Sequence, residues 1–97
     1  MKTQEEYKKI ATEQGMEIFN LLNGVDWDIV EDMLKDNKLV FDFYKDEVNE
    51  FIDVDYKDIN IALFRDKNNK VDIPMQNVEV WDEEEGKYFP ILMFKEV

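Results

Sequence analysis

The sequence predicts an α+β domain in which two N-terminal helices pack on one face of an antiparallel meander sheet of about five strands. Apolar side chains recur every three to four residues through residues 1–36, which is typical of helices. From residue 39 onward the apolar residues alternate or cluster in short runs between polar turns, which is typical of strands. Helices followed by strands favour an antiparallel sheet with its helices on one side. A chain of 97 residues fits one domain over 1–97.

Both helices have recognisable starting residues. Thr3 and Glu6 fit a capping box, which satisfies free amides at the start of a helix over residues 4–22. The apolar side of that helix is Tyr7, Ile10, Ala11, Ile18, Leu21 and Leu22. Asp26 is a favourable cap for a second helix over residues 27–36. Its inner stripe is Trp27, Val30, Met33 and Leu34.

The remainder of the chain reads as strands joined by short turns. The expected strands span residues 39–44, 51–56, 59–64, 71–73, 78–81 and 88–94. Pro74 cannot donate to a strand ladder, so an edge or a bulge is expected there. The polar stretches 66–70 and 82–87 predict hairpin loops, and Gly86 suits the positive φ of the second loop.

The charge of the chain is strongly negative and evenly distributed. Asp and Glu number 24 against 12 Lys and Arg, so the formal net charge is −12. Residues 1–48 and residues 49–97 each carry half of the acids and half of the bases. Such a field repels nucleic acids and anionic membranes and attracts basic surfaces. The expected partner is therefore a basic protein, with no direct binding to nucleic acid or membrane.

Several residue types are missing, and their absence excludes whole classes of chemistry. The sequence contains no Ser, Cys or His, which excludes Ser–His and Cys–His nucleophiles and imidazole or thiolate metal sites. Its three glycines match no phosphate-binding loop. We therefore expect a protein that is not an enzyme and needs no cofactor or metal. Without cysteine, a signal peptide or an apolar run of membrane length, a cytoplasmic location is the default expectation.

The first candidate for a partner-binding surface is the acidic stretch 41–58. Asp53 and Asp55 point the same way from one strand, about 6.6–6.8 Å apart. Strand pairing would place them in a ladder with Asp42 on the face opposite the helices. The candidate residues are Asp42, Asp46, Glu47, Glu50, Asp53, Asp55 and Asp58. Such a surface could imitate nucleic-acid phosphates, or it could be an ordinary solvated sheet face.

Two further acidic clusters could likewise be either partner-binding surfaces or ordinary solvated surfaces. Four consecutive acids in the second hairpin loop form an expected anionic knob: Asp82, Glu83, Glu84 and Glu85. The outer side of the second helix carries Asp28, Glu31, Asp32 and Asp36, for which an ordinary solvated face is favoured.

Other patterns give no convincing site. The stretch from Asp66 begins like a calcium loop, but Lys70 occupies a ligand position, so a hairpin turn is favoured. A pair of hydrolytic carboxylates is unspecific among so many acids and would need a substrate cleft. The aromatic residues are expected mostly in the core, but Phe51 and Phe89 could lie at an interface, and Tyr44 or Trp81 is a candidate interface anchor. The aromatic set is Trp27, Phe41, Phe43, Phe51, Trp81, Phe89 and Phe94.

In size and charge the chain resembles phage-encoded anti-defence proteins, including anti-CRISPRs, and bacterial immunity proteins that neutralise nuclease toxins. The resemblance is one of composition. It implies a small acidic inhibitor that occludes a basic, nucleic-acid-handling site on a nuclease or effector by nucleic-acid mimicry. The alternative is a non-catalytic accessory or ligand-binding module that forms a homodimer through an edge strand. A monomer and a homodimer both remain open.

Overall fold

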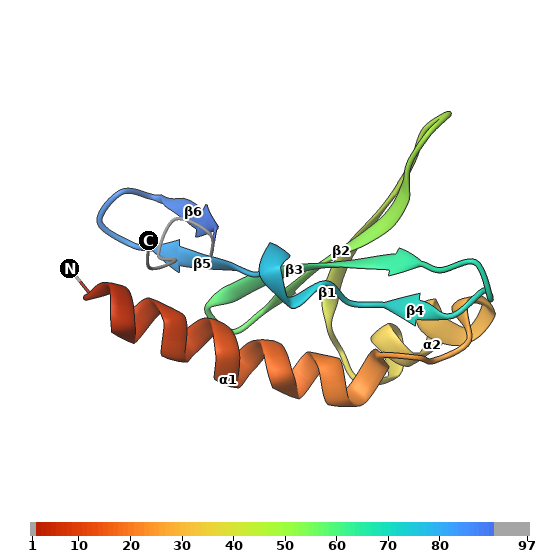
Figure 1. Cartoon of the computed structure of the whole chain (residues 1–97), viewed down its shortest axis with the longest axis horizontal. Helices are drawn as coiled ribbons and strands as arrows, with labels where there is room; N and C mark the ends of the chain where they lie inside the picture. Colours follow the sequence, from red (N-terminus) through yellow and green to blue (C-terminus); the bar gives the residue numbers. More distant parts are fainter. Residues whose placement is uncertain (1, 91–97) are drawn as a thin grey trace.

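The computed structural model describes residues 2–90 and confirms the predicted α+β fold. Two helices come first and lie on the same side of the sheet (Figure 1). They are followed by six strands and one short 3-10 helix. The elements are α1 (Gln4–Leu22), α2 (Trp27–Asp36), β1 (Val40–Lys45), β2 (Glu50–Tyr56), β3 (Ile59–Arg65), β4 (Val71–Asp72), η1 (Met75–Asn77), β5 (Glu79–Asp82) and β6 (Lys87–Pro90). Residues 91–94 of the last predicted strand, including Phe94, lie outside the described residues.

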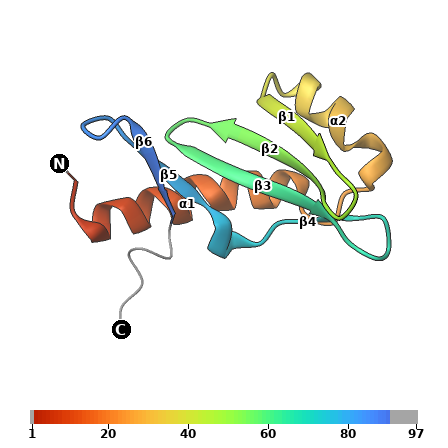
Figure 2. The same ribbon diagram turned by 90° about the horizontal axis from the view of Figure 1, so that it is seen from above.

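The sheet is antiparallel throughout, in the order β1-β2-β3-β5-β6, with β4 also paired to β3 (Figure 2). The strand β3 pairs with β5 near its beginning, where Ile59 lies opposite Val80, and with β4 near its end. Pro74 and η1 separate β4 from β5. In place of the edge or bulge expected at Pro74, the strand ends at Asp72 and a 3-10 helix follows the proline.

The helix ends have the predicted caps. The Thr3 hydroxyl accepts a hydrogen bond from the Glu6 amide, and the capping box is complete. Gly24 follows α1 with a φ of +78°, a conformation that costs glycine little. The Asp26 carboxylate accepts from the Asp28 amide at the start of α2. Neither helix is apolar over the length that crossing a lipid bilayer requires.

The core lies between the helices and the inner face of the sheet. Alternate residues of the two central strands are fully buried there: Ile52, Val54, Ile59, Ile61 and Leu63. The helices contribute Ala11, Ile18, Leu22, Val30 and Leu34. Burying one such aliphatic side chain stabilises the fold by about 1.5–3 kcal/mol, so these rows fix which face of the sheet is covered.

The aromatic residues are less buried than the sequence predicts. Trp27 is buried and Phe41 packs against the core. The expectation of a core position is wrong for Phe43, which is exposed, and Trp81, the other candidate interface anchor beside Tyr44, is exposed as well. Phe51 is half-buried, but it lies on the face opposite the helices, because its neighbour Ile52 faces the core.

Gly15 lies in the middle of α1 because the helix passes very close to η1 there. A Cβ atom at this position would lie 2.8 Å from Met75 Cε and 3.3 Å from Val78 Cγ2. The Met75 side chain is flexible, whereas Val78 is buried. The glycine therefore lets α1 approach the sheet despite its poor helix propensity.

Replacing Gly15 with valine is expected to destabilise the fold by about 1–3 kcal/mol, because the larger side chain overpacks this contact. Urea denaturation would measure the change. The matched control is Asn20→Val on the exposed side of α1, where valine and asparagine have nearly equal helix propensity. An equal effect of the two substitutions would show that the close approach does not matter.

Candidate functional site

The strand register brings four carboxylates together on the sheet face opposite the helices. Asp42 of β1 lies directly opposite Asp53 of β2, as the sequence predicts. Asp55 lies two residues along β2 and is paired with Asn60 of β3. Asn60 is in turn paired with Glu79 of β5. The ladder of carboxylates predicted for this face is therefore present.

We call this surface the open face, because no described helix covers it (Figures 1 and 2). It comprises the alternate residues of the paired strands that point away from the core. They are Val40, Asp42, Tyr44, Phe51, Asp53, Asp55, Asn60, Ala62, Phe64, Asp72, Glu79, Trp81, Tyr88 and Pro90. The set includes five acids and no lysine or arginine.

The carboxylates of the open face affect one another electrostatically. Partial burial raises the pKa of Asp53 despite the opposing effect of the Asn60 amide, and the neighbouring charges of Asp55 and Asp42 raise it further. Burial and the charge of Asp53 also raise the pKa of Glu79. The charged forms of Asp53 and Glu79 are therefore less favourable in the folded protein than in the unfolded chain.

Neutral donors, rather than cations, surround Asp55. Its Oδ1 accepts a hydrogen bond of 2.9 Å from the Asn60 amide and one of 3.3 Å from the Tyr88 hydroxyl. Burial and the nearby charge of Asp55 raise the pKa of Tyr88, which keeps its hydroxyl protonated as a donor. These contacts orient the carboxylate without neutralising it.

The four carboxylates Asp42, Asp53, Asp55 and Glu79 form what we call the acidic row, and aromatic side chains pack against one another at both of its ends. Tyr44 stacks on Phe51 with ring centroids 5.0 Å apart, and Phe51 lies 5.6 Å from Phe64. At the other end Trp81 meets Tyr88 edge to face at 5.0 Å. Aromatic residues beside charges are common anchors of protein interfaces.

Four of the seven acids predicted in the stretch 41–58 lie away from the open face. The Asp46 carboxylate accepts from the amides of Val48 and Asn49 in the β1–β2 turn, and these bonds lower its pKa. Glu47 is exposed in the same turn. The other two lie elsewhere in the fold.

Glu50 belongs to the helix side of the sheet, where it accepts from Trp27 Nε1 at 3.0 Å and pairs with Arg65 at 3.3 Å. Asp58 lies in the β2–β3 turn and exchanges hydrogen bonds with the Gln14 side chain. Both carboxylates therefore support the packing of helices on the sheet.

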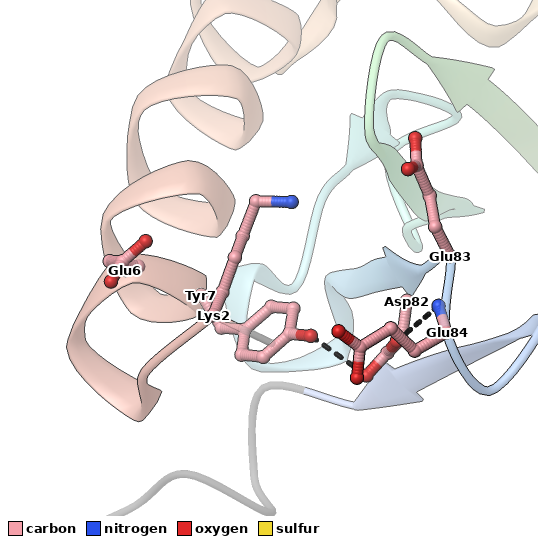
Figure 3. Close-up of a pocket in the computed structure, with 6 residues that line it drawn as sticks. All are labelled: Lys2, Glu6, Tyr7, Asp82, Glu83 and Glu84. Carbon is pink, nitrogen blue, oxygen red and sulfur yellow. Dashed lines mark hydrogen bonds between the residues drawn. The ribbon is translucent and has the colours of Figure 1, made fainter.

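The predicted anionic knob is smaller than expected, because Asp82 is buried with an exposed fraction of 2%. The expectation that all four acids are exposed is wrong at this residue. The Tyr7 hydroxyl donates to Asp82 Oδ2 at 2.8 Å, and the Glu84 amide donates to Oδ1 (Figure 3). The Glu85 amide also donates to Oδ1. The knob retains Glu83, Glu84 and Glu85 as exposed residues.

The remaining acidic patterns behave as ordinary structure. The acids on the outer side of α2 are exposed, and Glu31 pairs with Lys35 at 3.5 Å. Asp66 accepts from the amides of Asn68 and Lys70, which makes the predicted hairpin turn. Within residues 2–90 no group of three acidic side chains is arranged to hold a metal ion.

Sequence reasoning missed Glu79, Asn60 and Tyr88 as members of the open face. The alternation of Glu79 with buried Val80 was visible in the sequence. The pairing of β5 with the beginning of β3 could not be read from the sequence, because η1 lies between β4 and β5 and breaks the regular succession of strands.

Comparison with known proteins adds no identification, since no protein-family model, no curated protein and no solved structure matches the chain.

The raised pKa values predict that Asp53 and Glu79 stabilise the fold more as pH falls from neutral towards their unfolded values of about 4. A carboxylate whose pKa is higher in the folded state stabilises the fold below its unfolded value of about 4, and that contribution is lost as pH rises through the folded value. Asp53→Asn should therefore raise the urea midpoint at pH 7 and weaken this pH dependence. The matched control is Asp32→Asn on α2, and an equal effect of both substitutions would contradict the account.

The buried pair of Tyr7 and Asp82 should make the fold less stable as pH falls in the acid range, which is opposite to the effect of Asp53 and Glu79. The Tyr7 hydroxyl lowers the pKa of Asp82, so its stabilising contribution is present above pH ~4 and is lost as pH falls through the folded pKa. Tyr7→Phe should lower the urea midpoint at pH 7 and have a smaller effect in strong acid.

Alkaline pH provides a second test of the same pair. The hydrogen bond to Asp82 raises the pKa of Tyr7 from 10.0 to about 12, so the wild-type protein should lose stability between these values. Tyr7→Phe should reduce that loss. Tyr44→Phe is the control, because the Tyr44 ring is half-exposed on the open face. A loss that persists unchanged in Tyr7→Phe would rule out this assignment.

Proposed function

We propose that the protein is a small acidic inhibitor that binds a basic, nucleic-acid-handling site of a partner protein through its open face. Binding there would occlude the site. One observation carries this proposal: Asp42, Asp53, Asp55 and Glu79 share the open face, on which residues 2–90 place no lysine or arginine.

In the part of the chain that the structure describes, the lysines and Arg65 lie outside the open face. The described ion pairs join Lys9 to Glu13, Lys35 to Glu31, Lys57 to Glu17, Arg65 to Glu50 and Lys70 to Asp26. The four carboxylates of the acidic row take part in none of these. Like charges on neighbouring strands destabilise a sheet, and lysines or arginines of a partner would relieve that cost. They would also accelerate the encounter, since opposite charges steer association.

The chemistry of the open face suits arginine and lysine in particular. Carboxylates, like phosphates, accept strong charge-assisted hydrogen bonds from these side chains. The exposed rings of Tyr44 and Trp81 offer faces against which a guanidinium can stack. A basic groove that normally holds nucleic acid presents lysines and arginines that can make these hydrogen bonds and stacking contacts. The open face would therefore compete with the phosphate backbone for the same cations.

The central experiment neutralises the acidic row in a partner complex. A partner captured from host lysate at low salt would be purified and titrated by calorimetry. We expect affinity to fall at least about tenfold, about 1.4 kcal/mol, in the triple variant Asp53→Asn, Asp55→Asn, Glu79→Gln. Wild-type affinity should also fall steeply between ~50 and ~300 mM salt, because charged contacts are screened.

The matched control neutralises three acids on the outer side of α2: Glu31→Gln, Asp32→Asn, Asp36→Asn. It changes the net charge equally and should leave affinity nearly unchanged at ~300 mM salt, where long-range effects are screened. Labelled DNA or RNA bound to the partner should be displaced by the wild-type protein. Equal losses in the two triple variants, or a partner that binds nucleic acid and this protein simultaneously, would contradict the proposal.

A further inference from the structure

The strand β1 forms one edge of the sheet and carries few of the features that usually protect such an edge. It has six residues in unbroken register with β2, without a proline or a bulge. At the other edge of the described sheet, β6 has four residues, begins with Lys87 and ends with Pro90. Lysine, proline and short length discourage the pairing of another strand. On β1 the side-chain protection is limited to Lys45 at its end, and α2 lies beside the strand on its helix side, where Trp27 contacts Phe43 (Figure 2).

Large apolar side chains on β1 and its hairpin are exposed. Val40 has an exposed fraction of 65%, and Phe43 and Tyr44 are nearly half-exposed. Val48 at the tip of the β1–β2 hairpin is 88% exposed, and this hairpin rises away from both helices (Figure 1). Among the described strands, β1 pairs with β2 alone. Its outer backbone groups thus form an open template for one more strand.

We propose that β1 accepts an added strand from a partner protein, with a lysine or arginine opposite Asp42. Residues directly opposite in neighbouring strands place their side chains on the same face. A cation at that position would meet Asp42 directly, with Asp53 about 4.8 Å further across the sheet. Val40 and Tyr44 flank Asp42 on the same face, so the added strand should alternate apolar, basic and apolar residues there.

A second copy of this chain fits the edge poorly. If two β1 strands pair about Asp42, the two Asp42 carboxylates oppose each other. If they pair about Phe43, Asp42 meets Tyr44 of the second copy. The basic residue of β1, Lys45, lies two residues after Phe43, so both side chains point to the helix side of the sheet. Each copy also brings a net charge of −12. Charge complementarity therefore favours a basic partner strand.

This inference rests on the proposed function for the sign of the partner's charge, but backbone pairing at β1 is a separate contact. The two can fail independently. Backbone hydrogen bonds persist at salt concentrations that screen exposed charges. If the open-face triple variant loses the partner but the β1 amides exchange at the same rate with and without a peptide, the proposed function is supported and strand addition at β1 is not.

The test uses two synthetic peptides of alternating threonine and valine, one with a central lysine and one with a central glutamate. Amide hydrogen exchange measured by NMR would report pairing at residues 40–45. The lysine peptide should slow exchange there and bind about fivefold more tightly than the glutamate peptide.

Variants of Asp42 make the test specific. Asp42→Lys should reverse the preference, so that the glutamate peptide binds better. Asp72→Lys, on the open face but at β4, is the matched control and should leave the preference unchanged. Unaltered exchange at β1 with both peptides, equal affinity for both, or sedimentation of the protein alone as a dimer with protected β1 amides would overturn the proposal.

Discussion

The alternation of side chains along β2 and β3 is the constraint on which the rest of the structure depends. Successive residues of a strand point to opposite faces, so the aliphatic residues that bury against the helices also decide where Asp53 and Asp55 lie. A shift of one residue in register would bury both carboxylates and expose the core. The core and the acidic row are thus two sides of one pattern, and α1 and α2 cover the side that is apolar.

Acids that look equivalent in the sequence have different surroundings in the fold. Asp46, Glu50 and Asp82 each have donors that satisfy them, and they stabilise a turn, the helix–sheet contact and the β5–β6 loop. Asp53 and Glu79 instead have pKa values raised by burial and like charge. Natural proteins often retain such unfavourable groups where binding requires them, at a cost in stability. This contrast distinguishes the open face from the other acidic surfaces of the chain.

Local patterns predicted most of the fold and part of the site. The helix bounds followed from the caps at Thr3 and Asp26, and the facing of Asp53 followed from alternation. Long-range contacts could not be predicted in the same way. Asp82 is buried because Tyr7, 75 residues away in sequence, reaches its carboxylate. Glu79 joins the acidic row because β5 pairs with β3 across the interruption at η1, which no local pattern specifies.

The account depends on where a basic partner touches this chain. Carbodiimide joins a carboxylate to a lysine amine in direct contact, so cross-linked peptides identified by mass spectrometry would locate the interface. We expect cross-links from partner lysines to Asp42, Asp53, Asp55 and Glu79 on the open face. Cross-links confined to the acids of α2, with the open face unmodified by the partner, would contradict it.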